Sequence, residues 1–115
     1  MSTRSQIGFY EKGEKDLNKW EALIFRHWDG DPETVLKDIV PILKDFNKNR
    51  GLDDVEYASA WLVAKLKDDY LNIGICRMFH TDIEFFYAVY PDKLVVYQVT
   101  NGFPNDWRKI NTVKL

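Results

Sequence analysis

The feature that most constrains the fold is a change of hydrophobic period along the chain, from two residues to about 3.6 and back to two. Residues 3–10 alternate as in a strand with two unlike faces, and residues 20–29 carry bulky groups on both faces, as in a central strand. Apolar residues then recur at three- and four-residue spacing within residues 32–50, and strand-like segments return after residue 73. This order predicts an α+β fold.

Two helices are predicted in the middle of the chain. Asp31-Pro32-Glu33 is typical of a helix start, because a carboxylate accepts the first free amides and proline needs no donor there. Pro41 predicts either a kink or a division of this helix, and Gly51 predicts its end. Asp53 and Glu56 have capping-box spacing for a second helix. That helix is apolar almost all round, so it either lies between the sheet and the first helix or meets another subunit.

Three strands are predicted after the helices as a meander, at residues 73–80, 83–90 and 94–100. The tail contains the breakers Asn101, Gly102 and Pro104, and we expect it to pack back irregularly. Together these elements predict one domain over residues 1–115, with a largely antiparallel five-stranded sheet and two helices on one face.

Charge and cysteine content narrow the environment and the partners. Sixteen Lys and Arg against eighteen Asp and Glu give a net charge of −2, so we expect no nucleic-acid polymer as partner. No stretch reaches the roughly 20 apolar residues of a membrane span, and residues 1–5 do not resemble a signal peptide. Cys76 is the one cysteine and cannot form an internal disulfide. These features favour a cytoplasmic protein.

Two similar patterns of the form His-x-Asp-x-acid fall at predicted strand ends. The first contains His27 and Asp29, and the second contains His80, Asp82 and Glu84. Alternate residues of an extended chain share a face, so the patterns could together hold a divalent metal through His27, Asp29, His80 and Asp82, with Glu84 as catalytic base. The alternative is structural: the acids serve as turn or cap acceptors, and each histidine is a half-buried ring.

A second candidate is a ligand site that contains two arginines. Arg4 and Arg26, with the serine and threonine hydroxyls of residues 2–5, could bind a phosphate or a carboxylate, and Trp28 could stack on a small ligand. The structural alternative is that Arg4 pairs with a nearby acid, Asp29 or Glu84, and orders the sheet edge.

The segments 2–5, 27–32 and 80–84 are similar to those of a group of small uncharacterised microbial and phage proteins. Members of the group begin Gly/Ser-Thr-Arg-Ser and carry an Asp-Gly-Tyr-Pro signature, in which this chain has Asp31 in place of the tyrosine. The resemblance marks Arg4, His27, Asp29 and the acids of the second pattern without implying a reaction. It implies an accessory protein of a mobile element.

Three functions follow from these features. The first is a binding module for a protein partner or a small polar ligand, without a cofactor. We expect it not to be an enzyme because the sequence contains no recognisable nucleophile–base pair. The alternative is a metal-dependent hydrolase acting on a phosphate ester or a nucleotide. The third is a structural subunit of a larger assembly, and the second helix makes a homo-oligomer an expectation as well.

Overall fold

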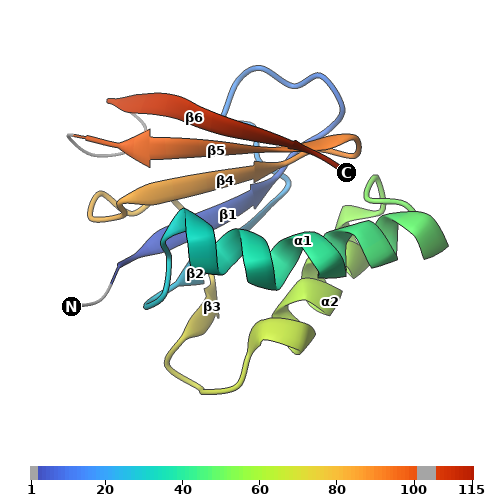
Figure 1. Ribbon diagram of the computed structural model, residues 1–115, viewed down its shortest axis with the longest axis horizontal. Helices are drawn as coiled ribbons and strands as arrows, with labels where there is room; N and C mark the ends of the chain where they lie inside the picture. The colour runs from blue at the N-terminus through green and yellow to red at the C-terminus, as the bar shows by residue number, and fades with distance from the viewer. Residues whose placement is uncertain (1–2, 101–105) are drawn as a thin grey trace.

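The computed structural model describes residues 3–100 and 106–115, which form six strands and two helices (Figure 1). The strands are β1 (Ser5–Phe9), β2 (Ala22–Arg26), β3 (Ile73–Ile75), β4 (Phe85–Val89), β5 (Lys93–Val99) and β6 (Trp107–Lys114). The helices are α1 (Pro32–Asn49) and α2 (Val55–Leu66). The strands form one mixed sheet in the order β3-β2-β1-β4-β5-β6, and both helices cover one of its faces (Figure 1). The predicted α+β class is confirmed.

The prediction of a five-stranded, largely antiparallel sheet is wrong in two respects. First, β1 pairs in parallel with β4, because the chain crosses over through both helices before it returns to the other side of β1. Second, the tail forms a sixth strand, β6, which pairs antiparallel with β5. Nearly all residues of β6 are exposed, so backbone pairing with β5 rather than a hydrophobic pattern makes it a strand. The breakers at positions 101, 102 and 104 lie outside the described residues.

The strand predicted at 73–80 ends at Ile75, and the chain then crosses the sheet face opposite the helices. Gln6 of β1 holds this crossing segment. Its side-chain amide donates to the Met78 carbonyl at 3.1 Å, and its side-chain oxygen accepts from the His80 N–H at 2.9 Å. A buried amide on a central strand therefore fixes a segment more than 70 residues away in the sequence.

The first helix runs without division from Pro32 to Asn49 with Pro41 inside it. Pro41 is exposed, so its ring meets solvent rather than the sheet. Asp31 caps the helix as predicted, since its side chain accepts from the Thr34 N–H at 3.1 Å and the Thr34 hydroxyl at 2.9 Å. The chain leaves the helix through Gly51, whose φ of 105° favours glycine.

The second helix, α2, packs on α1 and on β2 and β3, with Ala58 and Leu62 buried. Its other side is exposed at Tyr57 and Trp61, so the helix is not buried all round in this chain. Arg50 lies over the Tyr57 ring at 4.3 Å, and a lysine covers Trp61 in the same way. No helix within the described residues is long and apolar enough to cross a membrane.

Two apolar clusters form, one on each face of the sheet. The cluster under the helices includes Ile7, Phe9, Ile24, Val35, Ile39, Leu43, Leu62, Tyr87 and Val96. The cluster on the other face is rich in aromatic rings and includes Tyr10, Leu23, Ile83, Phe86, Tyr90 and Tyr97. Loop residues such as Leu17 and Phe79 cover this second face in place of helices. The central strands are therefore buried on both faces, and one polar hollow opens where β2 meets the two helices.

Candidate functional site

A polar cleft of about 370 Å³ opens where the end of β2, both helices and the segment after α2 meet. Its lining residues are Arg26, Trp28, Asp29, Thr34, Asp38, Ile42, Lys65, Leu66, Asp68 and Asn72. Arg26, Trp28 and Asp29 were singled out from the sequence, and the other lining residues were not.

Arg26 is the most buried charged residue of the cleft, with 5% of its surface exposed. It projects toward the helices because alternate residues of β2, such as Ile24, enter the core on that face. One terminal guanidinium nitrogen, Nη2, donates to the Asp38 carboxylate at 2.7 Å, and Nε donates to the Trp28 carbonyl at 3.2 Å. The cleft therefore contains a fixed positive charge that is largely removed from water.

Two buried polar atoms beside this cleft have no hydrogen-bond partner among the described residues. They are the second terminal nitrogen of Arg26, Nη1, and the hydroxyl oxygen of Ser5. Ser5 lies opposite Arg26 in the β1–β2 ladder. An unsatisfied buried donor costs about 1–3 kcal/mol. Both atoms are enclosed by the protein, so this cost falls on the interior behind the cleft wall.

The turn that joins β2 to α1 shapes the mouth of the cleft. Asp29 has a φ of 58°, in the left-handed region that only short polar residues and glycine adopt readily. Gly30 follows, and a Cβ there would lie 2.6 Å from the Thr3 carbonyl oxygen and 2.7 Å from the Ser5 hydroxyl. The Tyr87 hydroxyl donates to the Gly30 carbonyl at 2.7 Å. This tight turn holds the Asp29 side chain at the cleft while α1 begins two residues later.

Charge in the cleft is mixed. Burial alone would raise the pKa of Asp31, beside the cleft, but hydrogen bonds from Thr34 and the nearby charge of Arg26 hold that pKa below its usual value. Asp29 and Asp68 are exposed carboxylates in the lining, and Lys65 brings a second cation that also lies 4.5 Å from the Trp61 ring. The cleft can thus contact both an anionic and a cationic group of one small molecule.

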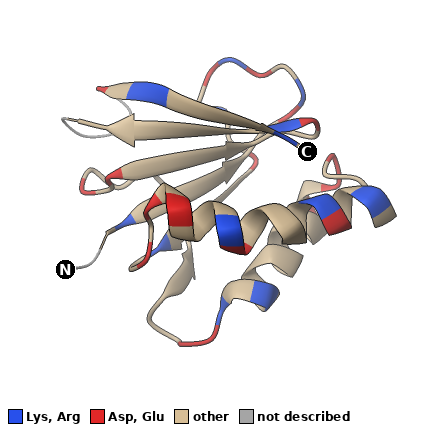
Figure 2. Ribbon diagram, viewed as in Figure 1, with Lys and Arg blue, Asp and Glu red and all other residues tan. Residues whose placement is uncertain are grey.

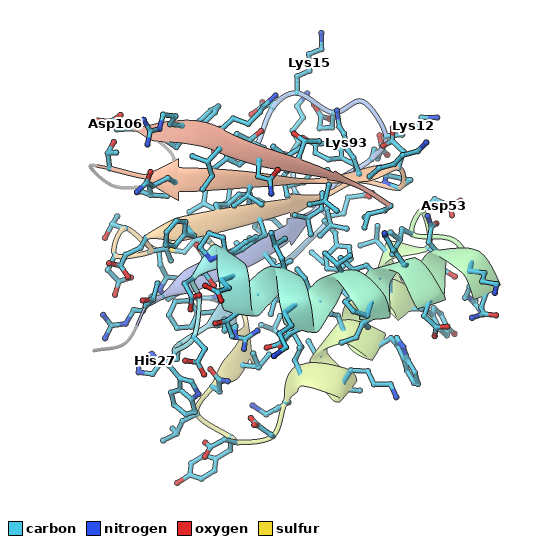
Figure 3. The ribbon with its side chains drawn as sticks, in the orientation of Figure 1. Lys12, Lys15, His27, Asp53, Lys93 and Asp106 are labelled. Atoms are coloured by element: carbon cyan, nitrogen blue, oxygen red, sulfur yellow. The ribbon has the colours of Figure 1, made fainter. Side chains whose placement is uncertain are left out.

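The two predicted histidines lie on the sheet face opposite the helices. The His27 and His80 rings both contact Phe25 of β2, with centroid distances of 5.9 Å and 4.5 Å. Figure 3 shows His27 near the end of β2, on the side of the molecule where the chain begins. Asp29 instead lines the cleft under the helices, and His80 and Asp82 line a separate hollow of about 300 Å³. The two histidines are brought near one ring, whereas Asp29 and Asp82 are placed in different hollows and Glu84 lines neither of them.

Arg4 pairs with an acid just before the central strands β1 and β4, and the partner is Asp82 rather than Asp29 or Glu84. The distance from Arg4 Nη1 to Asp82 Oδ2 is 3.6 Å, and both side chains are exposed, so this pair adds little to stability. Glu84 is also exposed and joins the ladder through its backbone, since its N–H donates to the Arg4 carbonyl. Arg4 does not line the cleft that contains Arg26.

Within residues 3–100 and 106–115, no three His, Cys, Asp or Glu side chains form a group that could hold a metal ion. The metal site predicted at His27, Asp29, His80 and Asp82, with Glu84 as base, therefore gains no support from the geometry of this part of the chain. It stays a prediction that the metal content of the purified protein tests.

The sequence did not point to Asp38 and Asn72. Asp38 lies on the polar side of α1 and reads there as a solvated charge, yet it is the ionic partner of Arg26. The Asn72 side chain accepts from the Trp28 N–H at 3.3 Å, and its backbone carbonyl accepts from the His27 N–H at 2.8 Å. A buried arginine predicted on a strand implies an acid nearby, but no local signal says which one.

Comparisons with family models, with curated protein sequences and with solved structures find no match to this chain. The resemblance to small microbial and phage proteins of the Thr-Arg-Ser type is thus neither supported nor contradicted.

Proposed function

We propose that the protein is a binding module and that the cleft around Arg26 and Trp28 takes a small zwitterion, such as a free amino acid. A ligand of this class carries a carboxylate for the cations of the cleft, Arg26 and Lys65. It also carries an ammonium group for the carboxylates, Asp29 and Asp68. Trp28 and Ile42, which line the cleft, supply apolar contact for a short aliphatic part.

One observation carries the proposal. Arg26 is 5% exposed yet lies in the lining of an open cleft, and one nitrogen of its guanidinium has no partner among the described residues. A protein gains nothing in stability from a buried cation that is only partly satisfied. The guanidinium is instead a fixed positive charge at the cleft wall, which attracts an anionic group of a bound molecule directly or through a bridging water.

The test is a titration of ¹⁵N-labelled protein in which amide chemical shifts report binding. The zwitterionic probes are glutamine and arginine, the single-charge probes are acetate and ethylamine, and glucose is the uncharged control. We expect glutamine or arginine to give saturable shifts at amides of the cleft, and acetate or ethylamine alone to bind more weakly. Each single-charge probe lacks the partner for one set of charges. Shifts of equal size with acetate alone would contradict a zwitterion site, and the lack of saturable shifts with every probe would contradict the module.

Two substitutions at the rim test which residues bind. Asp29→Asn removes a charge and keeps a residue that tolerates positive φ, and Lys65→Gln removes the exposed cation. Each is expected to weaken binding about tenfold, the loss of one charge-assisted contact. Lys44→Gln is the matched control, because Lys44 is exposed on α1 and outside the cleft. An equal effect of all three substitutions would place the ligand elsewhere.

A further inference from the structure

The two outer strands of the sheet, β3 and β6, differ in how they are protected against other chains. The sequence of β6 carries Arg108, Lys109 and Lys114, and its register with β5 is irregular, both of which are common protections of an edge. The sequence of β3 is Ile73-Gly74-Ile75, without a charged residue. In Figure 2 the ribbon of β3 is tan, without charged residues, whereas β6 carries a blue segment of basic residues. The strand β3, which is three residues long, therefore lacks the charged side chains and the irregular register of β6.

The hydrogen-bond pattern shows which backbone groups face outward at β3. The Asn72 carbonyl accepts from the His27 N–H, and the Cys76 N–H donates to the Leu23 carbonyl, each at 2.8 Å. Bonded residues alternate along an antiparallel strand, so Gly74, which lies midway, also faces β2. The N–H and C=O groups of both isoleucines of β3 therefore point to the open edge.

Apolar side chains gather on this edge and its flanks. Ile75 is 73% exposed although it lies on the same face as the buried Ile73. Leu71, two residues before the strand, is 63% exposed. Exposed apolar groups next to unpaired backbone groups are the combination that favours pairing with another chain.

We propose that the β3 edge is an interface between two copies of this chain, paired antiparallel about a two-fold axis at Gly74. In this register Ile73 of each copy faces Ile75 of the other. Both are residues whose backbone groups point outward, so the two copies satisfy each other. The net charges agree with this direction, since one lysine and two acids, Lys67, Asp68 and Asp69, precede the strand and Arg77 follows it. Antiparallel pairing brings the arginine of one copy toward the acids of the other, whereas parallel pairing would set like charges together.

Lys67 already contacts this edge. Its ammonium donates to the Ile73 carbonyl at 2.6 Å and to the Tyr70 carbonyl at 3.3 Å. A carbonyl oxygen has two acceptor lone pairs, so the Ile73 carbonyl retains one for the Ile75 N–H of a second copy. No residue of β3 lines the ligand cleft, although Asp68, which precedes the strand, does.

A disulfide across the axis tests the register. Residues that face each other without hydrogen bonds lie about 4.5 Å apart at Cα, within the range of about 4.4–6.8 Å that disulfides span. Gly74 faces its own copy in this way, and a Cβ there meets nothing within 4 Å. Gly74→Cys in a Cys76→Ser background is expected to form a covalent dimer in mild oxidant. Ile110→Cys in the same background is the control on β6 and is expected to stay monomeric.

Equilibrium sedimentation of the unmodified protein gives the second readout. The mass is expected to rise toward twice that of one chain as concentration increases. Ile75→Lys is expected to abolish both this rise and the Gly74→Cys cross-link, because it places a charge at the edge and leaves the internal ladder intact. Ile110→Lys is the matched control at a 41% exposed isoleucine of β6. A constant monomer mass, a cross-link that persists with Ile75→Lys, or equal cross-linking at position 110 would each overturn the proposal.

Discussion

The ion pair between Arg26 and Asp38 is the residue-scale feature on which the cleft depends, and its two halves are not equivalent. The Arg26 side chain is 7% exposed and the Asp38 side chain 37% exposed. Loss of the carboxylate leaves the buried Arg26 charge without an ionic partner, whereas loss of both groups leaves no buried charge to pair. We therefore predict that Asp38→Ala lowers the free energy of unfolding by about 1–3 kcal/mol, toward the lower end because water reaches the carboxylate.

The double variant Arg26→Met with Asp38→Ala is predicted to be more stable than Asp38→Ala alone. Urea unfolding of the wild type, both single variants and the double variant measures the coupling between the two residues. Additive effects of the two substitutions would show that the pair does not hold the cleft wall.

The helix cap at Asp31 gives the fold a pH dependence of known sign. The pKa of Asp31 is below its ordinary value of 3.8, so its charged form stabilises the folded protein above that pH. The contribution is lost as pH falls through the lower, folded-state pKa. We predict that Asp31→Asn, which keeps a cap acceptor but does not titrate, flattens the fall in stability over this acid range. Parallel unfolding curves of wild type and variant from pH 7 to about pH 2.5 would contradict this origin.

At the scale of elements, Pro41 is the residue whose local preference conflicts most with the structure. The α1 helix continues through it, so the ladder lacks the N–H that position 41 would otherwise donate toward Lys37. Pro41→Ala is predicted to raise the free energy of unfolding by about 1–2 kcal/mol. The gain in helix propensity exceeds the extra entropy that alanine gives the unfolded chain. Thermal or urea unfolding checks this, with the exposed Lys37→Ala as the near-neutral control, and a less stable Pro41→Ala would show that the proline is needed.

The elements that depend on local sequence were predictable, and the pairings between distant segments were not. The start of α1 follows from Asp31-Pro32-Glu33 because capping acts within one turn. The parallel pairing of β1 with β4 depends on where the crossover ends, and no turn signal encodes that. The strand β6 escaped prediction because its side chains are exposed and do not alternate.

The candidate site shows the same division. Asp29 was found from its place in a His-x-Asp-x-acid pattern, Arg26 as a cation on a predicted strand, and Trp28 as a ring that could stack on a ligand. Their arrangement in space was not predictable, because the residues that hold them, Asp38 and Asn72, come from α1 and from the segment before β3. The two histidine patterns look alike in sequence, but a helix begins after the first and a strand after the second. Asp29 and Asp82 therefore lie in different hollows.

For the whole molecule, the metal content separates a binding module from a metal-dependent hydrolase. The hydrolase needs a metal at His27, Asp29, His80 and Asp82, and metal that binds only the folded state also stabilises it. For the module we expect elemental analysis of untagged protein, after incubation with Zn²⁺ or Mn²⁺ and dialysis, to find well below one equivalent. We also expect a chelator to leave the unfolding temperature unchanged. One bound equivalent that His80→Ala removes would favour the hydrolase instead.

The most direct measurement of the central proposal is the contact between ligand and cleft in solution. Nuclear Overhauser effects between the aliphatic protons of the best-binding amino acid and the protein report distances at the site itself. The account predicts cross-peaks to the Trp28 indole and the Ile42 methyl groups, which line opposite elements of the cleft. Cross-peaks confined to residues outside the cleft, such as those of the hollow around His80, would contradict it.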